Sequence, residues 1–128
     1  MPRITLLFSL IVIILAGCVA LTDPEGKDAG PYPDNWRELV REYIKTNYVD
    51  PYSIRDSQIA PPFRSRKAFF DEWIVCLRNN AKNQFGGYTG LRTTDISIRQ
   101  GRVNIGSIDE TGFHCRRQNL DFEPLPIN

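Results

Sequence analysis

The sequence is poor in the residues that build metal and catalytic sites. Beyond residue 18, the only thiol and imidazole side chains are Cys76, Cys115 and His114. A structural zinc site takes four ligands, and these three fall short of it. No nucleophile, base and orienting group can be placed together, because the chain has one histidine and scattered carboxylates. We therefore expect no metal, no cofactor and no enzymatic activity; a Cys–His nucleophile and a metal site are the alternatives for the cysteines.

Charge is also absent from residues 4–16, whereas the remainder of the chain is rich in it. Arg3, an apolar run over residues 4–15 and then Ala16, Gly17 and Cys18 have the arrangement of an export signal. The string Leu15-Ala16-Gly17-Cys18 resembles the lipobox of bacterial lipoproteins. This resemblance implies that residues 1–17 are a cleaved signal peptide and that Cys18 becomes the acylated N-terminus. Several acyl chains on Cys18 would anchor the protein stably in a membrane.

Two further expectations concern the membrane. Val19 stands where an Asp would retain a lipoprotein at the inner membrane, so the resemblance implies the periplasmic face of the outer membrane in the bacterial envelope. The alternative is an uncleaved helix, because the apolar run through Leu21 reaches about 18 residues, near the lower limit for a membrane span.

The charge of the remaining chain is balanced. Removal of 17 residues leaves 128 − 17 = 111 residues, which is enough for one small domain. Only Arg3 is lost from the 16 basic residues, so 15 basic residues face 15 acidic ones. This balance gives no support for a nucleic-acid partner.

Cys76 and Cys115 form an even pair once Cys18 is acylated. In an oxidising periplasm such a pair favours a disulfide over two free thiols. Their separation of 115 − 76 = 39 positions would give about 4 kcal/mol in the chain-entropy model.

Residues 18–33 are rich in proline and glycine and have no apolar periodicity, which predicts a lipidated tether. An amphipathic spacing then predicts a helix, with an apolar face made of Trp36, Leu39, Val40, Tyr43 and Ile44. Asn35 and Glu38 have the spacing of a capping box at its start. Helical turns are expected over residues 51–57.

Apolar runs and alternation predict strands in the second half of the chain. They cover residues 68–81, 91–99, 102–108 and 113–117. The first should be buried on both faces, and Gln100-Gly101 should form a hairpin turn. Residues 59–67 are predicted to be irregular because of Pro61 and Pro62.

These elements predict an α+β fold, with an N-terminal amphipathic helix packed on a small antiparallel sheet of three to four strands and one disulfide. The domain should extend over residues 34–119, followed by an extended C-terminal tail over residues 120–128.

Residues 79–90 form the one unusual local string, Asn-Asn-Ala-Lys-Asn-Gln-Phe-Gly-Gly-Tyr-Thr-Gly. They carry no phosphate-loop, calcium-loop or glycosidase signature. One interpretation is structural, with left-handed glycines and amides that bond the backbone. The other is a polar recognition surface, made of Asn80, Lys82, Asn83, Phe85, Tyr88 and Thr89.

Asp50-Pro51-x-Ser53, a strand with a central Cys76 and the string over residues 80–90 together resemble a widespread group of small exported bacterial proteins. In that group a "DPxS" segment precedes a "VCxxVNAKNxxGGYxG" strand and turn. This chain departs from the pattern at residues 77–79 and lacks the Phe-Arg pair that commonly follows the serine of the first motif. The resemblance covers roughly residues 36–108 and implies the fold and export without an activity.

The expected function is therefore that of an outer-membrane lipoprotein which binds an envelope protein or peptidoglycan, or has a structural role there. The alternative is a small inhibitor or enzyme that acts on envelope polymers, with the inhibitor presenting a disulfide-clamped loop. Clustering of Lys82, Tyr88 and Arg92 around a deep cleft would favour a ligand binder or an enzyme. A flat or protruding patch would favour partner binding.

Overall fold

The computed structural model describes residues 28–67 and 69–127. The predicted signal peptide and Cys18 lie outside these residues. Among the helices of the described ranges, none combines the length and apolar character needed to span a membrane.

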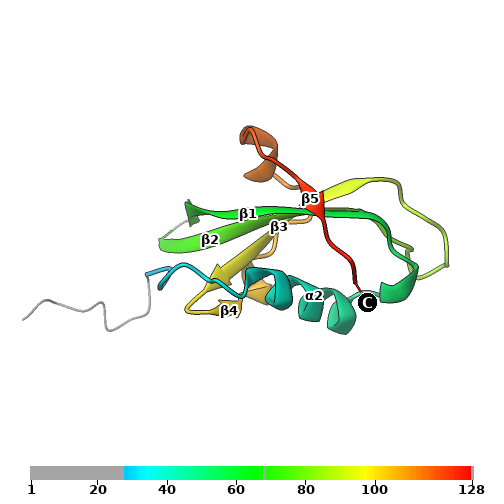
Figure 1. Cartoon of the computed structure of the whole chain (residues 1–128), viewed down its shortest axis with the longest axis horizontal. Coiled ribbons are helices and arrows are strands. Elements are labelled where there is room, and N and C mark those ends of the chain that lie inside the picture. Colours follow the sequence, from blue (N-terminus) through cyan, green and yellow to red (C-terminus); the bar gives the residue numbers. More distant parts are fainter. Residues whose placement is uncertain (1–27, 68, 128) are drawn as a thin grey trace, which may run out of the picture.

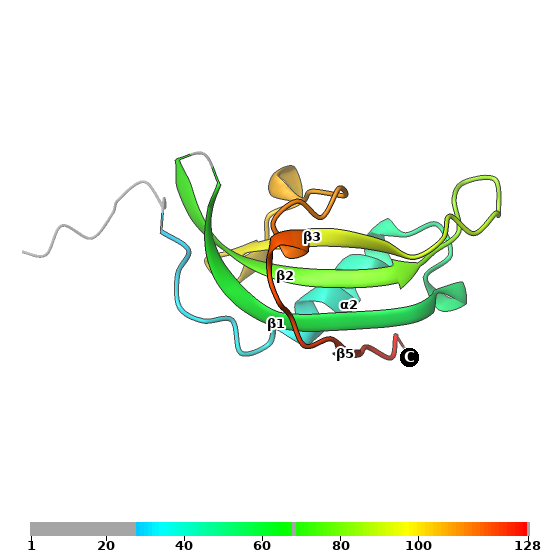
Figure 2. The same ribbon diagram turned by 90° about the horizontal axis from the view of Figure 1, so that it is seen from above.

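The domain is a five-stranded antiparallel sheet with one α-helix, α2 (Trp36–Asn47), across one face (Figure 1). Its strands lie in the order β4-β3-β2-β1-β5. Their bounds are β1 (Arg55–Lys67), β2 (Phe70–Asn80), β3 (Arg92–Arg99), β4 (Arg102–Val103) and β5 (Glu123–Pro124). After β4, residues 104–109 follow the edge of β3 and include the short 3₁₀ helix Ile105–Ser107. The later 3₁₀ helix Cys115–Arg117 lies on the face of the sheet opposite α2 (Figure 2), where Leu120 and Phe122 also pack.

The predicted α+β class and the single disulfide are confirmed. Two details of the prediction were wrong. The sheet has five strands rather than three or four, and the helix is not N-terminal, because residues 28–35 precede it and pack on the domain.

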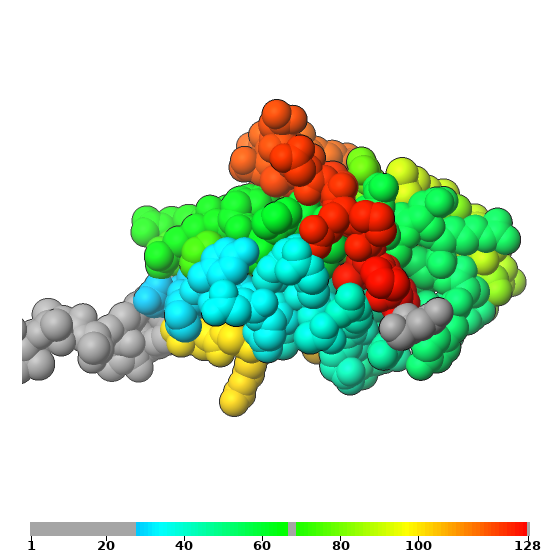
Figure 3. Space-filling view, viewed as in Figure 1, coloured from blue at the N-terminus to red at the C-terminus, as the bar shows by residue number. Residues whose placement is uncertain are grey.

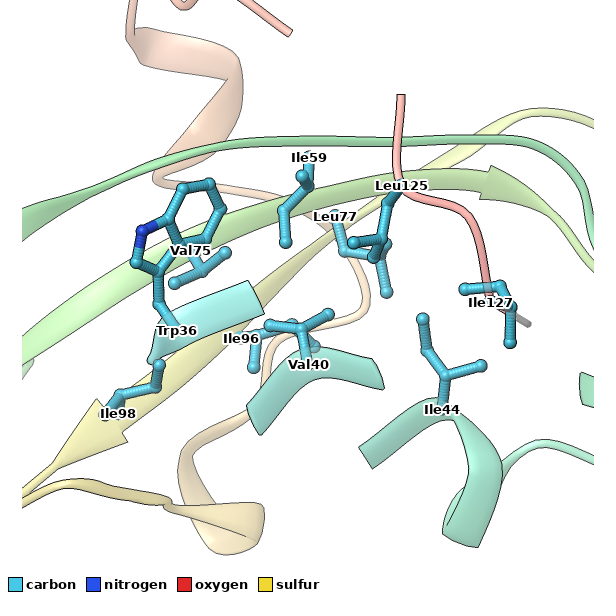
Figure 4. Packing of buried hydrophobic residues seen from close by; sticks show 10 residues of the cluster. All are labelled: Trp36, Val40, Ile44, Ile59, Val75, Leu77, Ile96, Ile98, Leu125 and Ile127. Atoms are coloured by element: carbon cyan, nitrogen blue, oxygen red, sulfur yellow. The ribbon is translucent and has the colours of Figure 1, made fainter. Parts of the chain in front are cut away.

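Helix α2 has the predicted apolar face. Trp36, Val40 and Ile44 are buried at intervals of four residues and point toward the sheet (Figure 4). The predicted capping box does not form, because Asn35 makes no side-chain cap. Glu38 instead forms an ion pair with Arg41 one turn along the helix, which leaves the first turn bonded through the Asn35 carbonyl.

Strand β2 is the central strand and is buried on both faces, as predicted. Val75 and Leu77 belong to the cluster under the helix, whereas Ile74 and Cys76 pack on the opposite face. All four side chains are at most 1% exposed. The alternation follows from the strand geometry, in which successive side chains point to opposite faces.

The prediction that residues 59–67 are irregular was wrong, because they belong to β1. This strand pairs with β2 along its length, and the register shifts between Ala60 and Phe63. The shift is a bulge that contains Pro61 and Pro62. Proline lacks the N–H group that a ladder needs, so a bulge allows it within a strand. The predicted helical turns are likewise shorter, since the 3₁₀ helix Pro51–Ser53 ends before β1 begins.

The predicted hairpin between β3 and β4 is confirmed. Gln100 and Gly101 both have positive φ values, 51° and 71°, as a two-residue turn of this kind requires. The strand predicted over residues 102–108 was too long, because β4 ends at Val103. The buried carboxylate of Glu72 accepts hydrogen bonds from Asn104 Nδ2 at 2.6 Å and Ser107 Oγ at 2.8 Å, which ties the segment after β4 to β2.

The disulfide between Cys76 and Cys115 is present, with the two Cα atoms 5.7 Å apart. Cys115 does not lie in the strand predicted over residues 113–117, however, but in a 3₁₀ helix. Gly112 brings this segment against β3. It has a φ of 65°, and a Cβ atom there would lie 2.7 Å from the Thr93 carbonyl oxygen, so only glycine allows this approach.

Both ends of the described chain pack against the domain. Residues 28–33, predicted as part of the tether, lie against the sheet, where Trp73 Nε1 donates to the Gly30 carbonyl at 3.1 Å. The C-terminal segment is extended, but it pairs with β1 through β5 and buries Leu125 and Ile127 in the helix-side cluster. In Figure 3 it lies in red between α2 and the green strand β1.

Candidate functional site

The loop between β2 and β3 extends beyond the sheet at the end opposite to Asp28, where the described chain begins (Figure 2). Asn83 organises its tip, because its Oδ1 atom accepts hydrogen bonds from the Phe85 and Gly87 N–H groups at 3.0 and 3.1 Å. Gly86 and Gly90 have φ values of 82° and 85°. These left-handed glycines and backbone-binding amides are the features of the structural interpretation of the sequence.

A second contact fixes this loop to the turn before β1. Lys82 Nζ forms an ion pair with the Asp50 carboxylate at 2.9 Å, and the Tyr88 hydroxyl donates to the Ser53 carbonyl at 2.8 Å. The hydrogen bond from Lys82 lowers the pKa of Asp50, and the same bond raises the pKa of Lys82. Both groups are therefore charged at neutral pH. The ion pair and the Tyr88 hydrogen bond place the Asp50-Pro51-x-Ser53 motif in contact with the motif over residues 80–90.

The six residues of the predicted recognition surface thus fall into two groups. Five of them bond the loop itself or the turn beside it. These are Asn80, which accepts from the Gly90 N–H, together with Lys82, Asn83, Tyr88 and Thr89. Phe85 differs, because it is 86% exposed at the tip. A recognition role for these residues remains a prediction.

An open cleft of about 340 Å³ lies beside this loop. Its walls come from the C-terminal half of α2, the end of β2, the loop and the start of β3. The lining includes Tyr43, Asn47, Tyr48, Asn79, Lys82, Asn83, Thr89, Arg92, Thr94 and Glu110. Most of these side chains are polar, so the cleft suits a hydrophilic ligand.

Two tyrosines form the aromatic part of the cleft. The rings of Tyr43 and Tyr48 meet edge to face, with centroids 6.1 Å apart. Burial raises the pKa of both phenols above the ordinary value for tyrosine, so both are neutral at physiological pH. Asn79 Nδ2 lies 3.3 Å from the Tyr48 hydroxyl and orients it.

Lys82 and Arg92 both line the cleft, as the ligand-binder expectation requires, but Tyr88 does not. Its ring lies behind Lys82, 5.6 Å from Nζ, and beneath the Arg55 guanidinium at 4.0 Å. The exposed Phe85 protrudes from the same end. A cleft and a protruding tip therefore occur together.

Sequence reasoning missed much of this cleft. Tyr43 was interpreted as part of the apolar helix face, and Asn47, Tyr48 and Glu110 were given no role. The sequence signal that could have indicated the cleft was the pair of tyrosines, Tyr43 and Tyr48, at the end of an otherwise apolar helix face. A tyrosine can place its ring in the core and its hydroxyl at the surface.

A different polar group lies under the disulfide on the opposite face. Asp95 is fully buried, and its carboxylate accepts from the N–H groups of His114 and Cys115 and pairs with His114 Nδ1 at 2.9 Å. Cys115 is bonded to Cys76, so its sulfur is not a free thiol. The bonds of Asp95 hold residues 114–115 against β3, which gives this carboxylate a structural task.

No protein-family model, curated protein or solved structure matches this chain. The resemblances to bacterial lipoproteins and to a group of small exported proteins therefore remain predictions.

Proposed function

We propose that this protein is a lipoprotein of the bacterial outer membrane whose periplasmic domain binds a cell-wall or protein partner. The observation that carries the proposal is the position of the cleft and the Phe85 loop. Both lie at the end of the sheet away from Asp28, the described residue nearest in sequence to Cys18. A partner could reach this end while the chain is anchored through Cys18.

The anchor rests on the sequence alone and is tested first. In cells supplied with labelled palmitate, the wild-type chain should incorporate label and migrate as the cleaved form. Cys18→Ser should incorporate none and accumulate as a larger precursor. Undiminished labelling of the variant would exclude Cys18 as the acylation site.

The binding end is tested by photo-crosslinking in intact cells. Phe85 and Phe69 make a matched pair, because each is 86% exposed and they lie at opposite ends of β2. Benzoylphenylalanine at position 85 should give a specific adduct that is absent at position 69. Equal adducts at both positions, or none at position 85, would contradict the assignment of this end.

A second candidate is a small inhibitor of an envelope enzyme, and the exposed Phe85 on an ordered loop favours it. The disulfide does not clamp this loop, contrary to the expectation, because it joins mid-β2 to the segment after Gly112. The ion pair of Asp50 with Lys82 holds the loop instead. An adduct at position 85 whose partner is a wall hydrolase, together with loss of its activity on adding the purified chain, would identify the inhibitor.

A further inference from the structure

The cleft has polar groups that the fold does not use. Among the described residues, no hydrogen-bond partner is found for the Tyr43 hydroxyl, for Asn47 Oδ1 or for Asn83 Nδ2, although the Tyr43 phenol interacts electrostatically with Tyr48 and Glu110. All three residues line the cleft. Together they provide donors and acceptors to a ligand, and none of them carries a charge.

The charges in the cleft nearly cancel. The ion pair with Asp50 balances the positive charge of Lys82. The other charged side chains that line the cleft are Arg92 and Glu110. Neither makes an ion pair with another described residue. A strongly anionic ligand would be repelled by Glu110, and a strongly cationic one by Arg92. The lining therefore favours a neutral ligand, or one with few charges.

The phenols add a directional preference. Because burial raises the pKa of Tyr43 and Tyr48, each hydroxyl remains protonated and can donate as well as accept. Aromatic rings also offer apolar surface to the C–H groups of a ligand. Hydroxyl and amide groups around an apolar ring surface complement a sugar, which has hydroxyls at its edge and C–H groups on its faces.

The walls suit a peptide less well. Extended peptides commonly bind by adding a strand to a free sheet edge. Here β3, which contributes Arg92 and Thr94, has β2 on one side, and on the other side its Asp95 is already bonded to the Asp109 backbone. The cleft offers side chains in place of a strand edge.

We propose that this cleft binds an uncharged glycan strand, so that the cell-wall partner is recognised through its sugars and not through its peptides. This inference rests on the proposed function and specifies the ligand of that same site.

The direct test uses the full chain purified in detergent and chitotetraose, a peptide-free tetrasaccharide of N-acetylglucosamine. Nitrogen-15 NMR should show concentration-dependent shifts of the amides around Asn47, Asn83 and Arg92. Tyr43→Phe, which removes one hydroxyl, should weaken binding by roughly fivefold, as the loss of one neutral hydrogen bond does. Arg102→Ala is the control, because Arg102 is exposed on β4 outside the cleft, and should bind as the wild type does.

Circular dichroism and a thermal melt establish that Tyr43→Phe is folded, and Arg92→Ala serves as a second cleft variant. The proposal is overturned if saccharide at millimolar concentration shifts no cleft amide. It is also overturned if neither cleft variant changes the affinity.

A second arm separates this inference from the proposed function. Purified wall sacculi are compared with sacculi from which an amidase has removed the peptides. The carboxylates that this hydrolysis leaves on the sugars are then converted to neutral amides, so that the two preparations differ in peptide and not in glycan charge. Retained binding to the stripped sacculi supports the glycan. Binding that disappears with the peptides, or a protein adduct at Phe85 without any saccharide binding, overturns the glycan while the binding function stands.

Discussion

Within residues 28–67 and 69–127, ten buried residues form one apolar cluster on the face of the sheet that α2 covers, whereas on the opposite face the corresponding cluster has four. Two of those four are the bonded cysteines. The opposite face also buries the carboxylates of Glu72 and Asp95, both at most 1% exposed. A large apolar area can hold a helix by burial alone, but a small one needs a covalent link and directed hydrogen bonds to keep an irregular segment in place.

The largest effect is expected from removing the covalent link. The double variant Cys76→Ala with Cys115→Ala should lower the free energy of unfolding by about 4 kcal/mol, because the unfolded chain is no longer closed into a loop. Urea denaturation measures it, and reduction of the wild type should give a similar loss. A change below about 1 kcal/mol would show that the hydrogen bonds hold this face without the disulfide.

On the helix side, Ile96→Ala should cost about 3 kcal/mol through lost burial and the cavity left behind, since Ile96 is fully buried. Ile105→Ala is the matched control, because Ile105 is 64% exposed, and it should change stability by less than about 0.5 kcal/mol. Similar losses for the two variants would contradict the described packing.

Asp95→Asn examines the directed bonds of the opposite face. Asn provides one acceptor oxygen in place of two, so one of the donors from His114 or Cys115 loses its partner, at a cost of about 2 kcal/mol. The exposed Asp121→Asn is the control and should be neutral. In a double-mutant cycle that combines Asp95→Asn with loss of the disulfide, the changes in unfolding free energy should be non-additive, because the Cys115 N–H bonds Asp95. Strict additivity would mean that the Asp95 hydrogen bonds and the disulfide stabilise this face independently.

The smallest effect is a pH dependence on the helix side. Burial raises the pKa of Tyr48 in the folded state, so its stabilising contribution is complete below the unfolded value of about 10 and is lost as the pH rises above it. Between pH 9 and pH 11 the wild type should lose more stability than Tyr48→Phe. Equal losses of stability in urea titrations would show that ionisation of Tyr48 does not cause the pH dependence. Tyr43, whose pKa is also raised by burial, would then be the phenol to test.

Local patterns predicted the elements that depend on neighbouring residues. The spacing of Trp36, Val40 and Ile44 predicted α2, and the apolar run through Cys76 predicted a strand buried on both faces. Gln100-Gly101 predicted the hairpin. In each case the burial or φ value that decides the structure is encoded within a few residues.

Other features depended on partners far away in the sequence. Pro61 and Pro62 led to the prediction that residues 59–67 are irregular. Their local effect is the bulge in β1, but pairing with β2 on both sides of the bulge keeps the strand continuous. The segment after Val103 has strand-like residues, yet it forms a 3₁₀ helix at the edge of β3, where Asn104 and Ser107 bond the distant carboxylate of Glu72.

The sequence by itself determined the helix, the central strand, the hairpin and the pairing of Cys76 with Cys115, because periodicity, turn chemistry and an even cysteine count are local or countable properties. Only the tertiary structure decided the cleft. Tyr43, Asn79, Arg92 and Glu110 come from separate segments, and no local pattern records that they meet. The physical reason is that packing of α2 on the sheet and the ion pair of Asp50 with Lys82 bring these segments together.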